Sequence, residues 1–409
     1  MNILVVTHYF FPENFRINDL AIGMKEKGHN ISVLTSIPNY PGPSYYKGYG
    51  LNQRREEDWN GIKIRRSPLI PRGSGSNLML AISWLSSVLG GLFSSIFHFK
   101  KKYDVIFVFA PSPILTCLPA IFIKRIKKIP ICLWVLDLWP ESVTSAGNLQ
   151  SSLIPKLLNP VIKYIYKNSD KVLVSSNGFI NAIMKKGITP NKIEFFPQWA
   201  ESIFKPISNY KNLLNDIPSN SFKIMFAGNI GEAQDFFSII EAAKILKSEK
   251  HIHWIILGSG RKEPWLRKKI IEYNLNDCFH LLGRHPIDKM PEFYAEADCM
   301  LFSLKKEYIF SITIPAKVQS YLACAKPIIA MIDGEGSKII NNSNAGLSCA
   351  SGDSDQLAKN IKKLSLMDKN DLTQLGENGL AYYNKYFERN QLLNILESRL
   401  LELSEKYKR

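Results

Sequence analysis

The feature that most limits how this chain can fold is an alternation of short apolar runs with longer amphipathic stretches. This alternation occurs twice along the chain. In the first round, residues 2–9, 31–36, 61–68, 104–110, 131–137 and 171–176 predict strands. Residues 18–28 predict an amphipathic helix that stops at Gly28. Near-continuous apolar strands that alternate with helices are typical of a mostly parallel sheet covered on both faces.

The second round begins after a linker-like stretch at residues 196–209. Strands are predicted at 222–228, 253–260, 278–283, 299–303 and 327–331, with intervening helices such as 234–249. The chain of 409 residues is long enough for two or three domains. We therefore predict an α/β protein with two Rossmann-like domains in tandem, residues 1–200 and 201–389.

The six cysteines are scattered through apolar stretches without a CxxC pair. This spacing argues against a zinc site or a disulfide framework and is typical of a reducing compartment. The first residues, MNILVVTHYFFPE, lack the basic region and the long apolar run of a signal peptide. We expect them to form the first strand.

The net charge of +16 is unevenly distributed. Residues 1–206 contain 25 Lys and Arg against 12 Asp and Glu, whereas residues 207–409 contain 27 against 24. The first half is therefore suited to an anionic partner: nucleic acid, an acidic membrane or a phosphorylated substrate. No helix-turn-helix, RNP or zinc signature accompanies the charge, which argues against nucleic acid.

Residues 78–97 form a twenty-residue stretch without a charge, long enough to span a bilayer. It contains five serines and a Gly-Gly pair and lies between strands of one predicted sheet. Spanning would separate those strands, so we predict a buried or interfacial helix. Because Lys100, Lys101 and Lys102 follow directly, a helix embedded in an anionic membrane surface is the sharper hypothesis.

Two carboxylates follow the buried apolar run at 131–136, in the sequence DLWPES. Ligands of open α/β sheets bind outside the carboxyl ends of strands, so we expect Asp137 and Glu141 to line a cleft between the two domains. A carboxylate pair that caps a helix is the alternative interpretation.

Three junctions in the second half place glycines between a strand and a helix. They are FAGNIGEAQDF with Gly228 and Gly231, IILGSGRK with Gly258 and Arg261, and HLLGRHP with Arg284. None is GxGxxG or a Walker loop, so neither a dinucleotide nor an ATP site is indicated. Three such strand ends in one domain favour a nucleotide ligand. Each arginine alone could instead be a solvated surface residue.

The stretch SITIPAKVQSYLACAKPIIA at 311–330 is the most specific local pattern. Pro315 suits the first turn of a helix that runs to about Cys324. The first-turn amides that begin at Pro315, whose own N–H is missing, and continue through Ala316 and Lys317 would face the cleft and hold a diphosphate, with Lys317 as a point charge and Ser320 one turn further on. An exposed helix lysine is the alternative for Lys317.

Near the N-terminus, FFPENFRINDL places Glu13, Asn14 and Arg16 at the carboxyl end of the first strand. They could contact a ligand or serve only as a cap and ion pair. The loop at 36–50, which contains Tyr40, is rich in Pro, Gly and Tyr. It could form an aromatic wall for a sugar or lipid acceptor or be merely structural.

Six segments, taken together and in order, resemble the retaining glycosyltransferases of family 4, which have the GT-B fold. They are FPENFRINDL, SIPNYP, DLWPES, FFPQWAE, GNIGEAQ and IPAKVQSYLA…KP. The likeness covers nearly the whole chain and is strongest to the WbuB-like branch from polysaccharide clusters. That branch is associated with N-acetyl-L-fucosamine transfer. The colanic-acid glycosyltransferase WcaI is similar more distantly.

The resemblance implies a UDP-sugar held by the C-terminal domain and a polyprenyl-diphosphate-linked acceptor at the basic N-terminal domain, in O-antigen or capsule synthesis. It also implies that the helix at 390–409 packs back on the first domain. We expect no metal and no cofactor, and a location at the cytoplasmic face of the inner membrane. Asp137 would orient a sugar hydroxyl or help take the acceptor proton, and Glu141 would orient its loop or bind the acceptor.

The sequence departs from the family pattern at several positions, so the residues that would bind the diphosphate are not identified by the resemblance. The two usual glutamates, eight residues apart, correspond to Ile312 and Ser320, and the usual Arg/Lys pair corresponds to Asn229 and Gln234. The family's common His after the fifth N-domain strand corresponds to Asp137. The candidates for the missing cation are Lys305, Lys317, Arg261 and Arg16.

Two other functions fit the same architecture. A UDP-sugar 2-epimerase would need no acceptor. A non-catalytic sugar-nucleotide-binding protein would fit the absence of the two glutamates.

Overall fold

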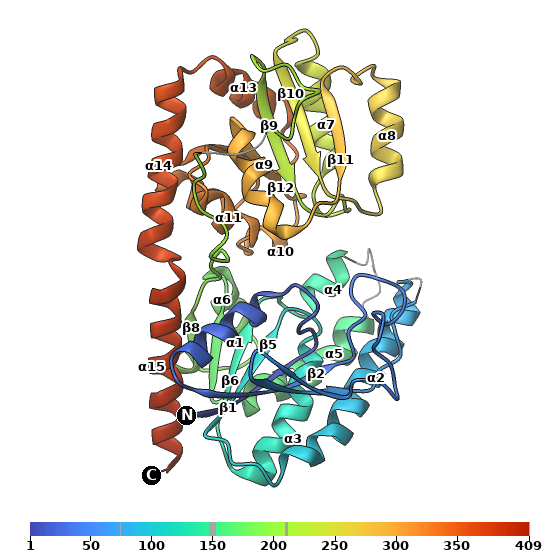
Figure 1. Cartoon of the computed structure of the whole chain (residues 1–409), viewed down its shortest axis with the longest axis vertical. Helices are drawn as coiled ribbons and strands as arrows, with labels where there is room; N and C mark the ends of the chain where they lie inside the picture. The colour runs from blue at the N-terminus through green and yellow to red at the C-terminus, as the bar shows by residue number, and fades with distance from the viewer. Residues whose placement is uncertain (74, 147–152, 209–211, 409) are drawn as a thin grey trace. The chain divides into compact units, whose positions relative to one another are not determined.

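The computed structural model describes residues 1–73, 75–146, 153–208 and 212–408 (Figure 1). The chain divides into two compact units. The N-terminal unit consists of Met1–Pro197 together with Asn390–Arg409, and the C-terminal unit is Gln198–Arg389. Each unit has its own sheet and is described separately below.

The sheet of the N-terminal unit has the order β3-β4-β2-β1-β5-β6-β7-β8. All neighbours are parallel except β3 and β4. Because the chain leaves β1 towards β2 on one side and resumes at β5 on the other, the order reverses beside β1. The strands are β1 Asn2–Thr7, β2 Asn30–Ser36, β3 Glu56–Trp59, β4 Ile62–Ser67, β5 Val105–Ala110, β6 Ile131–Val135, β7 Lys171–Val174 and β8 Ile193–Phe195.

Helices cover this sheet. α2 packs on β2 and β4, and α3, beside it, packs on β1, β5 and β6. The last helix returns from the C-terminal unit to this one, where Lys27 Nζ donates to Glu397 Oε2 at 2.7 Å. The helices are α1 Arg16–Glu26, α2 Asn77–Ser95, α3 Cys117–Lys127, α4 Glu141–Ala146, α5 Leu153–Asn168, α6 Gly178–Met184 and α15 Arg389–Lys408.

The sheet of the C-terminal unit is parallel throughout, in the order β11-β10-β9-β12-β13-β14. Its order reverses between β9 and β12. The strands are β9 Phe222–Ala227, β10 Ile252–Leu257, β11 Phe279–Gly283, β12 Cys299–Ser303, β13 Ile328–Met331 and β14 Gly346–Cys349. The helices are α7 Phe236–Ile245, α8 Glu263–Glu272, α9 Met290–Glu296, α10 Tyr308–Ser311, α11 Lys317–Ala323, α12 Glu335–Ser343, α13 Ser354–Ser365 and α14 Lys369–Tyr386.

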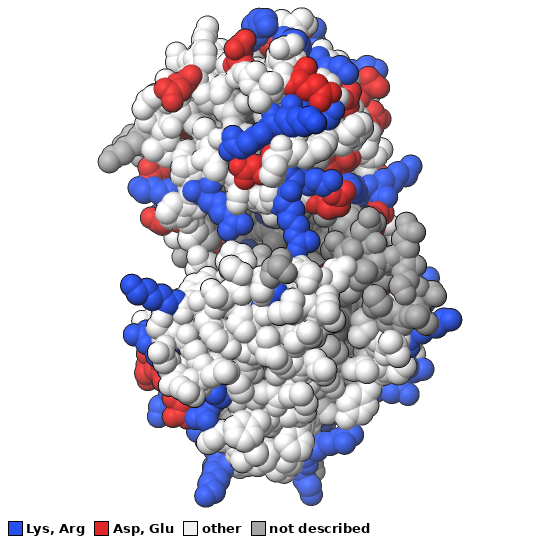
Figure 2. Space-filling view, turned by 90° about the vertical axis from the view of Figure 1, so that its right-hand side faces the viewer, with Lys and Arg blue, Asp and Glu red and all other residues white. Residues whose placement is uncertain are grey.

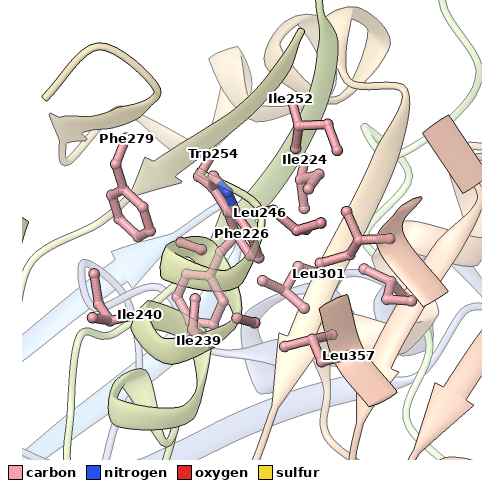
Figure 3. Packing of buried hydrophobic residues seen from close by; sticks show 14 of the residues in the cluster. Ile224, Phe226, Ile239, Ile240, Leu246, Ile252, Trp254, Phe279, Leu301 and Leu357 are labelled. Carbon is pink, nitrogen blue, oxygen red and sulfur yellow. The ribbon is translucent and has the colours of Figure 1, made fainter. Parts of the chain in front are cut away.

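One apolar cluster holds this unit together (Figure 3). Phe226 of β9 and Leu301 of β12 meet Ile239 of α7, and all three are buried. Trp254 lies beside Phe279 with ring centroids 5.9 Å apart. The rigid sheet that results fixes the loops at the carboxyl ends of its strands.

The α/β architecture with mostly parallel sheets is as predicted, but the structure adds three strands. β3 is EEDW, at an edge where only β4 pairs with it, so charged side chains can stay in water. β8 and β14 are three and four residues long, too short for a clear pattern. The first helix ends at Glu26, before Gly28, and the helix of residues 78–97 ends at Ser95 in a 3₁₀ turn, Ile96–His98.

Candidate functional site

Four glycines line the carboxyl edge of the C-terminal sheet, and we call them the glycine cradle: Gly228, Gly231, Gly258 and Gly260. Gly228 and Gly258 have φ of +146° and +142°, a region that favours glycine. A Cβ on Gly258 would lie 1.8 Å from the carbonyl oxygen of Gly228. The loops after β9 and β10 can approach one another only because side chains are absent here.

The side chains of Asn229 and Gln234 meet over Gly231. A Cβ on Gly231 would lie 2.3 Å from Asn229 Nδ2 and 2.8 Å from Gln234 Oε1. Within the described parts of the chain, Gln234 Oε1 is buried without a hydrogen-bond partner. A buried acceptor of this kind is costly unless a ligand or water satisfies it. The two amides that stand in place of the family's cationic pair are thus brought together.

Lys317 brings a cation to the same place. Its Nζ lies 3.9 Å from the ring centroid of Phe226 and would lie 2.7 Å from a Cβ on Gly228. Burial lowers the pKa of Lys317 to about 7. No ion pair involves Lys317 among the described residues. A half-buried ammonium between a ring and a glycine is suited to an anion that replaces the water it has lost.

The helix after Pro315 is shorter than predicted. α11 spans Lys317–Ala323, so Pro315 and Ala316 precede the helix and Pro315 does not lie in its first turn. The carbonyl of Pro315 instead accepts from Val318 N at 3.1 Å. Ser320 points inward and is buried. Tyr321, which the sequence analysis passed over, anchors the helix through its hydroxyl, which donates to the carbonyl oxygen of Ala227 at 3.3 Å.

Lys305 is engaged in an ion pair. Its ammonium donates to one oxygen of Glu232, and Lys262 Nζ lies 2.6 Å from the other. Hydrogen bonds from Lys262 and Lys305 hold the pKa of Glu232 below its usual range. These groups border a surface pocket of about 200 Å³ that is also lined by Gly231 and Trp265. An anion would have to compete with Glu232 for Lys305.

The two arginines lie at the same edge of the sheet. Arg284 follows β11 and donates through Nε to Ser259 Oγ, in the loop after β10. Arg261 follows Gly260 and is exposed. In this unit the structure therefore brings together Asn229, Gln234 and Lys317, with Lys305, Arg261 and Arg284 around them.

In the N-terminal unit, Glu13 lies beneath the loop that carries Tyr40. Its Oε1 accepts from Asn39 N at 2.9 Å and from Tyr40 N at 2.7 Å. In the described ranges its Oε2 is buried without a hydrogen-bond partner. Burial raises the pKa of Glu13 to about 7, although the backbone hydrogen bonds oppose the rise. Glu13 thus shapes the loop and retains one carboxyl oxygen for another partner.

Three aromatic residues, Tyr9, Phe15 and Tyr40, form a cluster with Arg72 at this loop. The rings of Tyr9 and Phe15 stack with centroids 4.5 Å apart, and Tyr40 is 40% exposed. Arg72 Nη2 donates to the Tyr9 hydroxyl at 2.6 Å, and its guanidinium lies 4.7 Å from the centroid of Tyr40. The cluster presents rings and a cation together, a combination that suits a sugar phosphate.

Sequence analysis missed both Tyr9 and Arg72. Tyr9 lies two residues beyond the end of the first strand and could have been found by the strand-end rule. Arg72 comes from a distant loop, and no local signal marks it. Two other residues near Glu13 were predicted to contact a ligand. Asn14 is exposed, whereas Arg16, the first residue of α1, is buried.

Asp137 lies two residues beyond the end of β6. Burial raises the pKa of Asp137 to about 7, and the side chains of Ser142 and Trp139 oppose the rise. Trp139 is fully buried and lies 4.9 Å from Trp84 of α2, centroid to centroid. The tryptophan therefore fixes the loop against α2, while the carboxyl group can hold a proton near neutral pH.

Glu141 begins α4 and accepts from Lys186 Nζ at 2.8 Å. This ion pair fastens the DLWPES loop to the segment after α6, which favours the structural interpretation of Glu141 over direct ligand contact. Among the described residues, no group of three or more His, Cys, Asp or Glu is placed to hold a metal ion.

Comparison with known proteins adds the family. Residues 14–199 match the model of a glycosyl transferase 4-like domain, and residues 214–381 match that of glycosyl transferases group 1. The chain is 29% identical over 251 residues to the probable glycosyltransferase WbjE of Pseudomonas aeruginosa, covering 58% of this chain and 61% of WbjE. The match thus spans less than two thirds of that relative.

Two further proteins resemble a larger part of the chain. The putative colanic acid biosynthesis glycosyl transferase WcaI of Escherichia coli (strain K12) is 25% identical over 79% of this chain and 81% of WcaI. The crystal structure of HepE from Anabaena in complex with UDP covers 98% of this chain and 100% of HepE, with a TM-score of 0.71 and 13% identity. The chain thus matches a glycosyl transferase 4-like domain followed by a group 1 domain, and its fold is that of the GT-B glycosyltransferases.

Proposed function

We propose that the protein transfers a sugar, with retention of configuration, from a UDP-sugar to a polyprenyl-diphosphate-linked saccharide during assembly of a bacterial surface polysaccharide. The donor sugar in this proposal is an N-acetylated deoxyhexosamine such as N-acetyl-L-fucosamine. WcaI is named for colanic acid biosynthesis, and the HepE structure contains UDP, which supports both halves of the proposal.

The observation that carries the proposal is the position of Lys317. It lies against Gly228 in the glycine cradle, at the reversal point between β9 and β12, where open parallel sheets bind nucleotides. Cleavage of the bond between the sugar and UDP builds negative charge on the β-phosphate. A half-buried ammonium held in place there stabilises that charge at little cost of reorganisation.

The other cradle residues would position the nucleotide. Asn229 and Gln234 offer amide hydrogen bonds beside Gly231, and the glycines let the backbone approach the phosphates. Lys305, Arg261 and Arg284 border this position, with Lys305 shared between Glu232 and the ligand. Bound UDP would also supply a partner for the buried Gln234 Oε1 or displace that side chain.

The acceptor would bind to the N-terminal unit. Glu13 and Asp137 both have a pKa of about 7, so either can accept a proton from a sugar hydroxyl near neutral pH. Arg72, with Tyr9 and Tyr40, would hold the saccharide diphosphate. We assign proton transfer to Asp137. Because the acceptor is lipid-linked, we place the enzyme at the cytoplasmic face of the inner membrane.

Titration of UDP into wild type, Lys317→Ala and Lys268→Ala tests the donor site directly. Lys268 is an exposed lysine of α8 in the same unit and serves as the control. Loss of a charge-assisted contact predicts a fall in UDP affinity of about tenfold or more for Lys317→Ala, and no change for Lys268→Ala. Equal affinities in all three proteins would refute the assignment of Lys317.

The reaction itself is tested with UDP-sugars and a polyprenyl-diphosphate-linked acceptor, with products identified by mass. We expect transfer by wild type and a strong loss in Asp137→Asn. Incubation with UDP-sugar alone separates the alternatives, because an epimerase would change the sugar without any acceptor. UDP binding without turnover of any donor would instead indicate a non-catalytic protein.

A further inference from the structure

The exposed side of the helix α2 carries four large apolar side chains, whereas its buried side consists mostly of small residues. Its buried residues are Ser83, Ser87, Val88, Gly90, Gly91, Ser94 and Ser95. By contrast, Leu78, Leu85, Leu89 and Phe93 are 59–71% exposed. Helices that pack on a sheet in water normally show the reverse arrangement. The helix therefore offers its most apolar side to something other than its own unit.

Backbone contacts fix this orientation. A Cβ on Gly90 would lie 2.0 Å from the carbonyl oxygen of Pro68, and one on Gly91 would lie 2.6 Å from Pro119 Cγ. The glycine side of α2 thus fits against neighbouring chain where no leucine could enter. The helix cannot rotate to bury its large side chains without losing this packing.

The exposed surface continues beyond α2. Ile96 and Phe97 of the following turn are exposed, as are Phe122 and Ile126 of α3. The ring centroids of Phe99 and Phe122 are 5.6 Å apart, which joins the two helices at this end. We call the combined surface the outer apolar face: Leu78, Leu85, Leu89, Phe93, Ile96, Phe97, Phe122 and Ile126.

Positive charge borders this face. Residues 59–136, which contain both helices, include 11 lysines and arginines and a single acid, Asp104. Lys100, Lys101, Lys102 and Lys128 are exposed and make no ion pair within the described ranges. Figure 2 shows a broad uncharged area on the N-terminal unit, with mostly blue side chains at its edges and a few red ones at the left. An apolar centre with a basic rim complements an anionic bilayer surface.

The helix lies on a membrane in this interpretation and does not cross it. By length and composition alone, Asn77–His98 would be able to span a bilayer, with a mean hydropathy of 1.7. However, α2 packs on β2 and β4, and the chain that follows it returns to the same sheet as β5. A helix attached to this sheet along its length can only enter the interfacial layer.

A second copy of the chain is a less suitable partner for the outer apolar face than an anionic bilayer. A symmetric pair would bring two basic rims together, since residues 59–136 provide one carboxylate against 11 cations. Like charges placed opposite one another oppose association. The phosphates of an anionic lipid surface have the complementary sign.

We propose that the outer apolar face docks the protein on an anionic bilayer, with the leucines and phenylalanines among the upper acyl chains and Lys100–Lys102 at the phosphates. The start of α2 follows Arg72, which bonds to Tyr9, and Trp84 of α2 contacts Trp139 beside Asp137. Docking would therefore bring the acceptor site to the lipid surface. This last step alone rests on the proposed function.

Sedimentation of the full chain with vesicles tests the proposal. We expect binding to vesicles of equal parts phosphatidylcholine and phosphatidylglycerol and little binding to phosphatidylcholine alone. Leu89→Glu with Phe93→Glu should reduce binding by tenfold or more, since two charges would enter an apolar layer. Lys100→Ala with Lys101→Ala and Lys102→Ala should reduce it on the order of 100-fold and remove the lipid preference.

Matched variants on the C-terminal unit serve as controls. Ile271→Glu with Leu366→Glu changes two exposed apolar residues, and Lys268→Ala with Lys359→Ala and Lys363→Ala removes three exposed lysines. Both should bind like wild type. Equal loss in the controls, or no binding by wild type, would overturn the proposal. So would a dimer of the wild type that Leu89→Glu with Phe93→Glu converts to a monomer.

UDP binding, measured on the same proteins, separates this proposal from the proposed function. Vesicle binding without UDP binding would leave docking intact and refute the glycosyl donor site. UDP binding and transfer to a water-soluble acceptor analogue, without vesicle binding, would leave the function intact and refute docking.

Discussion

At the scale of single residues, Lys317 combines a cost in stability with the donor-binding role proposed for it. Burial lowers its pKa to about 7, so between pH 7 and its ordinary pKa the unfolded chain binds the proton and the folded chain does not. Stability therefore rises with pH across this window. Such a buried charge is retained where a ligand needs it.

Lys317→Met should accordingly stabilise the C-terminal unit while weakening UDP binding. Replacement of a buried charge by an apolar side chain of similar length is expected to add about 1 kcal/mol or more. Thermal unfolding at pH 7 and titration of UDP measure the two effects. A variant that loses stability and UDP affinity together would show that Lys317 is merely structural.

Glu13 should make the N-terminal unit less stable as the pH rises through its raised pKa. With a folded pKa of about 7, the folded chain holds more protons than the unfolded chain between pH 4.5 and 7, so stability falls with rising pH there. Glu13→Gln keeps an acceptor for Asn39 N and Tyr40 N but cannot titrate. Melting temperatures from pH 5 to 8 should fall less steeply in Glu13→Gln. Parallel profiles would contradict the assignment.

At the scale of elements, Gly90 is expected to decide how closely α2 packs. Alanine favours a helix, yet a Cβ at this position would meet the carbonyl oxygen of Pro68 at 2.0 Å. Gly90→Ala should therefore destabilise the N-terminal unit by about 1–3 kcal/mol. The neighbouring Leu89→Ala, on the exposed side, should change stability by less than about 0.5 kcal/mol. Denaturant unfolding compares them, and equal effects would mean that α2 is not held by its small residues.

The elements that the sequence predicted are those whose pattern is local. Buried parallel strands such as β5, which is apolar throughout, and β1, which is apolar between Asn2 and Thr7, can be predicted from their residue types. The edge strand β3 carries charges because one side faces water, and its pairing with β4 depends on a contact that no local pattern encodes. The length of α11 was also misjudged, because Pro315 was placed inside the helix.

Some residues of the candidate site could likewise be predicted from local sequence, and others could not. Strand-end glycines and Lys317 could be found from the sequence because the nucleotide edge of a parallel sheet follows from the alternation of elements. Arg72 beside Tyr9, and Lys262 with Lys305 on Glu232, depend on loops that only the fold brings together. Strand order, which places β9 beside β12, is likewise a tertiary property.

At the scale of the whole molecule, the last helix ties the end of the chain to the N-terminal unit. Leu392, Leu393, Leu396 and Leu400 of α15 are at most 4% exposed. Arg399 Nε also donates to Glu194 Oε1 at 2.8 Å. Each buried leucine contributes about 1.5–3 kcal/mol, so together they rival the stability of a typical domain.

A chain that stops after Glu388 should therefore lose the cooperative unfolding of the N-terminal unit and keep that of the C-terminal unit. UDP should still raise the melting temperature of the remaining transition, because ligand binding stabilises only the unit that holds the site. Scanning calorimetry of both chains, with and without UDP, measures this. The full chain should show UDP stabilisation of one unit alone. If truncation abolished UDP binding as well, the C-terminal unit would depend on the N-terminal unit for its folding, and this prediction would be wrong.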